Sequence, residues 1–159
     1  MAQASDLKDS RTYENLLDAF AGDCKAAARY AFFARQARRE GFLDAGAALA
    51  ELARGKAEHA QGQLEFLCEL GDPQTQAEVG TTRQNVHSAI ERTTYERETL
   101  FPGLARVARE EGFDAVGGWF ETLAGAGRNQ TLALRAALRA LERSFSEHDD
   151  DEPPAAEGA

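Results

Sequence analysis

The chain has 159 residues, 43% of them hydrophobic, which is long enough for one domain with a substantial core. Its formal net charge of −9 depends on residues 147–159, which hold six of the 27 acidic residues and no basic one, leaving 21 acids against 18 bases elsewhere. No basic cluster of the kind that binds nucleic acid is present, and no apolar run approaches the roughly 20 residues that span a bilayer. Composition therefore argues against nucleic-acid-binding and membrane-spanning proteins.

The N-terminal sequence and the cysteines both indicate a reducing compartment. The first six residues lack the basic and then apolar pattern of a signal peptide. Cys24 and Cys68 form neither a CxxC motif nor a disulfide framework. We therefore expect a cytoplasmic protein.

Two long segments of helical periodicity come first, and neither alternates as a strand does. The first begins near Ser10 or Thr12, either of which suits an N-cap, and ends at Glu40 before Gly41. The second covers residues 42–70 and is closed by the sequence Gly-Asp-Pro. The residues that follow, up to Gly80, are expected to form a loop.

Two further helical segments follow this loop. Thr81 or Thr82 is the expected N-cap of the third, and Pro102 lies within it, where it should kink the helix or shift its register. The fourth is expected over residues 113–145. Residues 147–159 are acidic, small and proline-bearing, which is typical of a disordered tail, and residues 1–10 are interpreted as an N-terminal extension.

An internal repeat relates the two halves of the chain. Residues 34–42 match residues 105–113 at an offset of 71, so each half is interpreted as one helical hairpin. Two antiparallel hairpins joined by a long crossover predict an all-α, ferritin-like four-helix bundle over residues 11–146.

Polar residues occupy the helical face that should be buried in such a bundle. Lys56 and His59 lie three residues apart on the apolar stripe of the second helix, and the repeat aligns them with Gly127 and Gln130 of the fourth. Ferritin-like bundles commonly use these positions for two Glu-x-x-His pairs that bind two metal ions together with two further glutamates. Here the positions are present, but most of the ligands are replaced.

Several short motifs together resemble the rubrerythrin family. They are Ala19-Phe-Ala-Gly22, Ala28-Arg-Tyr30, Glu58-His59-Ala60, Phe101-Pro102 and the segment 105–113. The resemblance implies a diiron domain that reduces hydrogen peroxide, as in the defence against oxidative stress. In the family this domain is often joined to a rubredoxin domain, whose four cysteines have no counterpart here, so we expect no such domain in this chain.

The resemblance also assigns the family's metal positions in the first two helices. Asp23 replaces a ligand glutamate, Lys56 replaces a bridging glutamate, and His59 keeps the ligand histidine. Tyr30 matches a tyrosine that lies close to the metals in the family. A cation thus stands where the family has a bridging carboxylate.

The third and fourth helices depart further from the family pattern. Thr93 replaces one ligand glutamate, whereas Glu96 keeps the next. Gly127 and Gln130 replace the second bridging glutamate and its histidine, and Phe101 stands where the family has a tyrosine. The resemblance therefore predicts a degenerate metal site in which both bridging carboxylates are missing.

Two readings of these substitutions lead to different functions. In the first, Lys56 replaces metal charge and pairs with Asp23, Glu96 or both, leaving a cofactor-free, non-catalytic protein with a scaffold or partner-binding role. In the second, Asp23, His59 and Glu96 hold one iron or manganese ion in an oxidoreductase that reduces peroxide. The charge on Lys56 favours the first reading, because a dication beside an ammonium group is unfavourable.

Association is the remaining expectation. Family members commonly form dimers, and the loop of residues 71–80 is long enough to let one hairpin pack on a neighbour's. We expect a homodimer, swapped or unswapped, and no nucleic-acid or membrane partner.

Overall fold

The computed structural model describes residues 7–149, and every regular element in this range is helical, which confirms the all-α class. The elements are α2 (Arg11–Arg39), α3 (Leu43–Cys68), α4 (Thr82–Tyr95), the π-helix η1 (Glu96–Leu100), α5 (Phe101–Glu110) and α6 (Asp114–Asp149). Most of the predicted N-terminal extension and the end of the predicted tail lie outside the described residues. No described helix is both long and apolar enough to cross a membrane.

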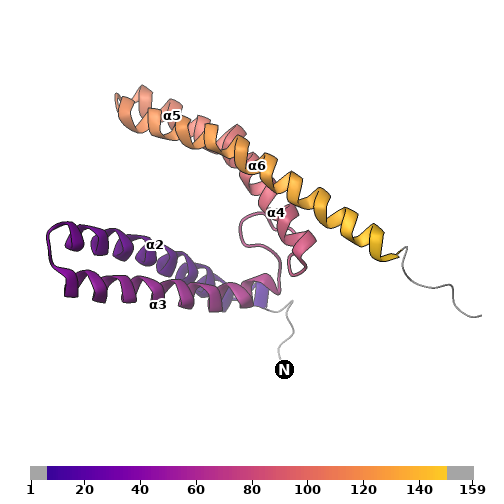
Figure 1. Ribbon diagram of the computed structural model, residues 1–159, viewed down its shortest axis with the longest axis horizontal. Coiled ribbons are helices and arrows are strands. Elements are labelled where there is room, and N and C mark those ends of the chain that lie inside the picture. The colour runs from indigo at the N-terminus through magenta and orange to yellow at the C-terminus, as the bar shows by residue number, and fades with distance from the viewer. Residues whose placement is uncertain (1–6, 150–159) are drawn as a thin grey trace, which may run out of the picture. The chain divides into compact units, whose positions relative to one another are not determined.

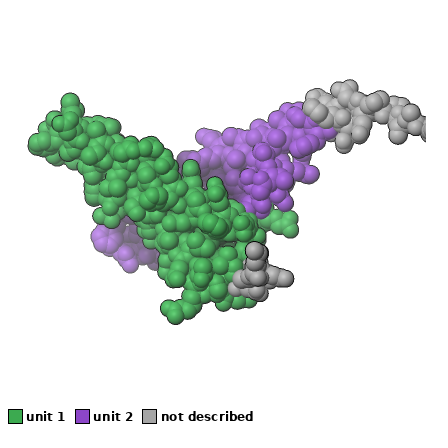
Figure 2. Space-filling view, turned by 90° about the horizontal axis from the view of Figure 1, so that it is seen from below, with its two compact units in different colours: residues 1–78 green, residues 79–159 purple. Residues whose placement is uncertain are grey.

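The chain divides into two compact units, residues 1–78 and residues 79–159, which are coloured separately in Figure 2. In the first unit, α2 and α3 run antiparallel, side by side (Figure 1). In the second unit, the succession α4, η1 and α5 packs along α6. Each half of the repeat is therefore one helical hairpin, as predicted.

Side-chain caps fix the starts of two helices. The hydroxyl oxygen of Ser10 accepts a hydrogen bond from the Tyr13 N–H at 3.2 Å, which identifies Ser10 as the N-cap of α2. Thr81 and Gln84 form a reciprocal capping box at the start of α4. Each cap satisfies backbone donors that a helix leaves free at its first turn.

The repeat extends to the backbone of the two hairpin turns. Gly41 and Gly112, 71 residues apart, adopt φ angles of +88° and +85°, a left-handed conformation that favours glycine after a helix. The following residues donate equivalent hydrogen bonds back into their helices, from Phe42 to the Ala37 carbonyl at 2.9 Å and from Phe113 to that of Ala108 at 2.7 Å.

A second pair of glycines lets the helices of each hairpin approach closely. A Cβ atom added at Gly46 would lie 3.3 Å from the Ala34 carbonyl oxygen, and one added at Gly117 would lie 3.2 Å from that of Ala105. These distances involve backbone atoms, which cannot move aside as a flexible side chain can. Small residues are therefore needed where the two helices of each hairpin cross.

The buried residues of α3 follow a seven-residue spacing. They are Gly46, Ala53, Ala60 and Leu67, and they form the seam against α2. Residues three positions after a buried residue also face the seam. Lys56 follows Ala53, and Gln63 follows Ala60, by this spacing. The hairpin geometry thus brings these two polar side chains to the α2 interface.

The third predicted helix changes register before its proline. The chain forms the π-helix η1, in which the Phe101 N–H donates to the Glu96 carbonyl, and Pro102 then lies in the first turn of α5. A proline there has no N–H to contribute, and the wider π turn accommodates this loss. The predicted register shift is confirmed.

The predicted end of the fourth helix at Phe145 is wrong. Helix α6 continues to Asp149, so the first residues of the predicted tail are helical. The tail was delimited by its acidic composition, but no glycine or proline interrupts the sequence before Pro153.

Candidate functional site

Asp23 of α2 and Lys56 of α3 form an ion pair across the first hairpin. The ammonium Nζ of Lys56 donates to Oδ1 of Asp23 at 2.7 Å. The Asp23 side chain is 15% exposed and that of Lys56 is 31% exposed. Buried Ala53 and Ala60 flank Lys56 along the seam, and their small side chains keep α2 within reach of the lysine.

Two more side chains approach the second oxygen of the same carboxylate. Gln63 donates from Nε2 to Oδ2 of Asp23 at 3.2 Å, and Nδ1 of His59 lies 3.8 Å from Oδ2. Both oxygens of Asp23 therefore already accept hydrogen bonds from the protein. Gln63 had no predicted role, although it lies two turns beyond Lys56 on the same seam, and this spacing is the signal that could have identified it.

His59 lies at the edge of the seam between α2 and α3. Its side chain is 64% exposed, because it immediately precedes Ala60 and lies at the edge of the seam. The imidazole can therefore rotate away from Asp23 without breaking the Lys56 contact.

The ion pair stabilises the charged forms of both partners. The hydrogen bond from Lys56 lowers the pKa of Asp23 below its usual 3.8, against the opposing effect of burial. The hydrogen bond to Asp23 and its negative charge raise the pKa of Lys56 above its usual 10.5. At neutral pH Lys56 is a fixed cation, which suits charge compensation better than proton transfer.

In the second hairpin, Glu96, the glutamate predicted to remain as a ligand, is also paired with a base. Nε of Arg92 donates to Oε1 of Glu96 at 2.8 Å, and both side chains are about 30% exposed. Arg92 was missed, although the i, i+4 spacing predicts this pair. At the other ligand position of this helix, the Thr93 hydroxyl donates to the Ala89 carbonyl at 2.7 Å.

Gly127 on α6, predicted to stand at the second bridging position, lies directly against an arginine. A Cβ atom at Gly127 would lie only 3.1 Å from Cβ of Arg97 on η1. The Thr131 hydroxyl donates to the Gly127 carbonyl at 2.8 Å, and Gln130 is exposed. Arg97 had no predicted role, because the contact joins two helices and depends on the register of η1.

The two predicted aromatic positions lie in different surroundings. Tyr30 is half-buried and lies near the Phe33 ring, with centroids 6.3 Å apart. Phe101 stacks on Phe120, with centroids 6.3 Å apart and an interplanar angle of 18°. Phe101 therefore belongs to an apolar contact and offers no hydroxyl group.

The remaining donors do not fit a dinuclear iron centre. Such a centre needs several carboxylates to offset the charge of two metal ions, whereas Asp23 and Glu96 are each paired with a base. Within either unit, among residues 7–149, no three His, Cys, Asp or Glu side chains converge as metal ligands do.

Comparison with known proteins decides the family. The Rubrerythrin family model matches residues 14–129. The chain belongs to the rubrerythrin family. This confirms the resemblance and the ferritin-like class.

Curated rubrerythrins from three bacteria are similar to this rubrerythrin-family chain. That of Nitratidesulfovibrio vulgaris is 36% identical over 123 residues, covering 74% of this chain and 64% of its own. That of Clostridium perfringens is 37% identical over 128 residues, covering 74% and 65%. Rubrerythrin-1 of Clostridium acetobutylicum is 30% identical over 146 residues, covering 87% and 75%. The chain thus spans less than two thirds of the length of the Nitratidesulfovibrio vulgaris and Clostridium perfringens proteins.

Proposed function

We propose that this rubrerythrin-family protein has replaced its metal centre by a metal-free charge cluster and serves as a scaffold or partner-binding protein. The observation that carries the proposal is the 2.7 Å contact between Lys56 Nζ and Asp23 Oδ1. The family places a bridging carboxylate at position 56, whereas this chain places a permanent cation there. Lys56 thus supplies positive charge that the metal would supply in a relative.

The first hairpin leaves little for a metal ion to bind. Both oxygens of Asp23 accept protein hydrogen bonds, so a metal would have to displace Lys56, Gln63 or both. A dication would also repel the ammonium group, whose pKa is raised and which therefore stays charged.

The second hairpin supports the same conclusion with different residues. Glu96 is engaged by Arg92, and Arg97 packs against the glycine that replaces the second bridging glutamate. Residues that offset or exclude a metal are therefore found in both halves of the chain.

The proposal is tested by metal analysis of protein expressed with added iron and manganese. We expect less than one equivalent of either metal, and hydrogen peroxide reduction no faster than in Lys56→Met. The matched control is Lys25→Met, which removes an exposed lysine from α2. One full equivalent of iron that is lost in Asp23→Ala would overturn the proposal.

A variant designed to restore metal binding tests the same proposal. Lys56→Glu restores one bridging carboxylate beside Asp23, so it should bind iron or manganese more tightly than the wild type. Lys25→Glu makes the same charge change on the exposed face of α2 and should have no such effect. Equal metal binding by the two variants would show that position 56 does not control the site.

One contact favours a second candidate, a mononuclear peroxide-reducing oxidoreductase. His59 Nδ1 lies 3.8 Å from Asp23 Oδ2, so an imidazole and a carboxylate from different helices already adjoin. With Glu96 they would provide a one-histidine, two-carboxylate ligand set for iron or manganese. Stoichiometric metal that is lost in both His59→Ala and Glu96→Ala would favour this candidate.

A further inference from the structure

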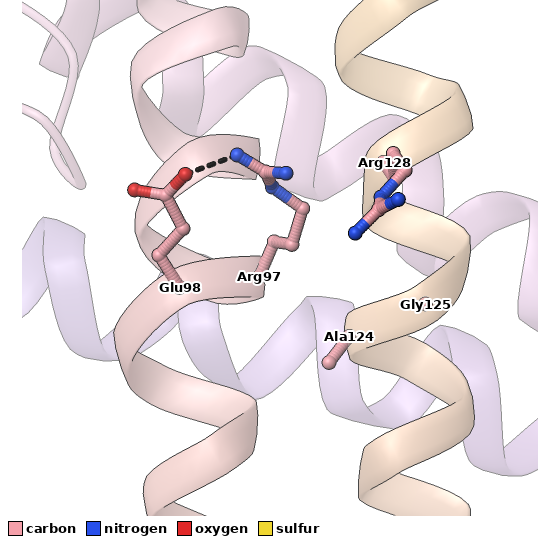
Figure 3. A pocket seen from close by; sticks show the side chains of 5 residues that line it. All are labelled: Arg97, Glu98, Ala124, Gly125 and Arg128. Atoms are coloured by element: carbon pink, nitrogen blue, oxygen red, sulfur yellow. Dashed lines mark hydrogen bonds and ion pairs between the residues drawn. The ribbon is translucent and has the colours of Figure 1, made fainter.

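An open recess lies between η1 and α6 within the second hairpin (Figure 3). Its volume is about 580 Å³, and its lining residues are Arg97, Glu98, Ala124, Gly125 and Arg128. None of them is a metal-ligand position of the family. The recess shares Arg97 with the Gly127 contact described above, but it contains none of the predicted ligand residues.

Two arginines from different helices line this recess. The stem of Arg97 leans from η1 toward α6 and its guanidinium group turns back to Glu98, whereas the Arg128 guanidinium group lies on the side of α6 near η1 (Figure 3). Arg97 donates from Nη2 to the carboxylate of Glu98, whereas its Nε is buried without a hydrogen-bond partner among the described residues. Arg128 forms no ion pair with any residue that the structure describes.

The charge of the lining is unbalanced. Two guanidinium groups face a single carboxylate, which is already engaged by Arg97, so the recess has one positive charge in excess. Like charges facing each other are destabilising unless an anion lies between them. The planar donor fork of arginine matches the oxygens of a phosphate group especially well.

Small residues of α6 hold this geometry open. Gly125 has nothing within 4 Å of the position where a Cβ atom would lie, and Ala124 adds only a methyl group. Because Gly127 has no side chain, the Cβ atom of Arg97 can pack against α6. A Cβ atom at position 127 would lie 3.1 Å from it. The Arg97 side chain is thereby fixed near its Cβ atom, and its guanidinium group borders the recess.

We propose that this recess binds a tetrahedral oxyanion of the phosphate class between the guanidinium groups of Arg97 and Arg128. The oxyanion is either inorganic phosphate or the phosphate group of a small phosphomonoester. This site does not depend on the metal state of the first hairpin.

The test titrates the full chain with inorganic phosphate at constant ionic strength and follows the arginine Nε–H signals by NMR. We expect saturable shifts of the Arg97 and Arg128 signals. Arg128→Gln should weaken binding by about tenfold, as expected from the loss of a charge-assisted contact. The control Arg135→Gln removes an exposed arginine two turns later on α6 and should bind like the wild type.

Two further ligands define the specificity. Tighter binding of glycerol 3-phosphate would identify a phosphomonoester site, and equal binding would identify the inorganic ion; both results support the proposal. Acetate at the same ionic strength should not produce the shifts. Equal shifts with acetate, a linear response without saturation, or unchanged binding in Arg128→Gln would each overturn it. Because Arg128 is exposed, its variant should fold normally, which circular dichroism checks.

Discussion

Gly127 and Gly125 lie two residues apart on α6, yet alanine should affect them differently. Replacing a glycine inside a helix by alanine contributes about 1 kcal/mol through helix propensity. At Gly125 nothing lies within 4 Å of the new methyl group, so this gain should appear nearly in full. At Gly127 the methyl group would lie 3.1 Å from Cβ of Arg97, a contact that one of the two helices must relieve by shifting.

The magnitude follows from comparing these two effects. Overpacking of this kind typically costs roughly 1–3 kcal/mol, and the helix-propensity gain is common to both variants. The free energy of unfolding of Gly127→Ala should therefore lie about 1–3 kcal/mol below that of Gly125→Ala. Relative to the wild type, Gly125→Ala should be more stable, and Gly127→Ala should be unchanged or less stable.

Urea denaturation followed by circular dichroism measures both variants under the same conditions. The transition midpoints should move apart while the dependence on urea stays the same. Equal stabilisation by both substitutions would refute the reasoning, because it would mean that Arg97 does not pack against Gly127. It would also remove the support that this contact gives to the arginine recess.

Three other properties can be measured. Gly46→Ala and Gly117→Ala should each lower the free energy of unfolding by about 1–3 kcal/mol, because the new methyl group meets a carbonyl oxygen. The control Gly55→Ala should not lower it, because nothing lies within 4 Å of its new methyl group. The stability difference between the wild type and Lys56→Met should be largest near neutral pH. It should shrink as pH falls through the Asp23 pKa, which lies below 3.8, and as pH rises through the Lys56 pKa, which lies above 10.5; a pH-independent difference would contradict the ion pair. Light scattering should give twice the chain mass of 17.3 kDa if the protein is the homodimer that we propose, and the single-chain mass would refute that proposal.

Most of the fold could be predicted because its signals are local. Ser10 and Thr81 cap helices through side chains that reach backbone groups three residues away, and Pro102 disturbs the turn immediately before it. The repeat added the long-range information, since matching turns at Gly41 and Gly112 require matching hairpins. The end of α6 was missed because composition alone does not stop a helix.

The candidate site was harder to predict because its contacts join different helices. The sequence indicated that Lys56 needs a carboxylate partner, but it could not choose between Asp23 and Glu96. The choice depends on the α2–α3 seam, whose seven-residue spacing places Lys56 opposite Asp23. Glu96 pairs instead with Arg92 of α4, which precedes it by one helical turn.

The substitutions at the predicted ligand positions are matched by their neighbours, which is what the proposed replacement of the metal centre, rather than simple decay, would produce. A site that had only lost ligands would leave Asp23 partly buried without a cation, and burial would then raise its pKa. Instead Lys56 lowers that pKa. In the other hairpin, the loss of the carboxylate at Gly127 coincides with an arginine, Arg97, that occupies the space beside it. Restoring a carboxylate at position 127 alone would therefore meet Arg97, whereas Lys56→Glu meets Asp23 and His59, and only the second change should recover metal binding.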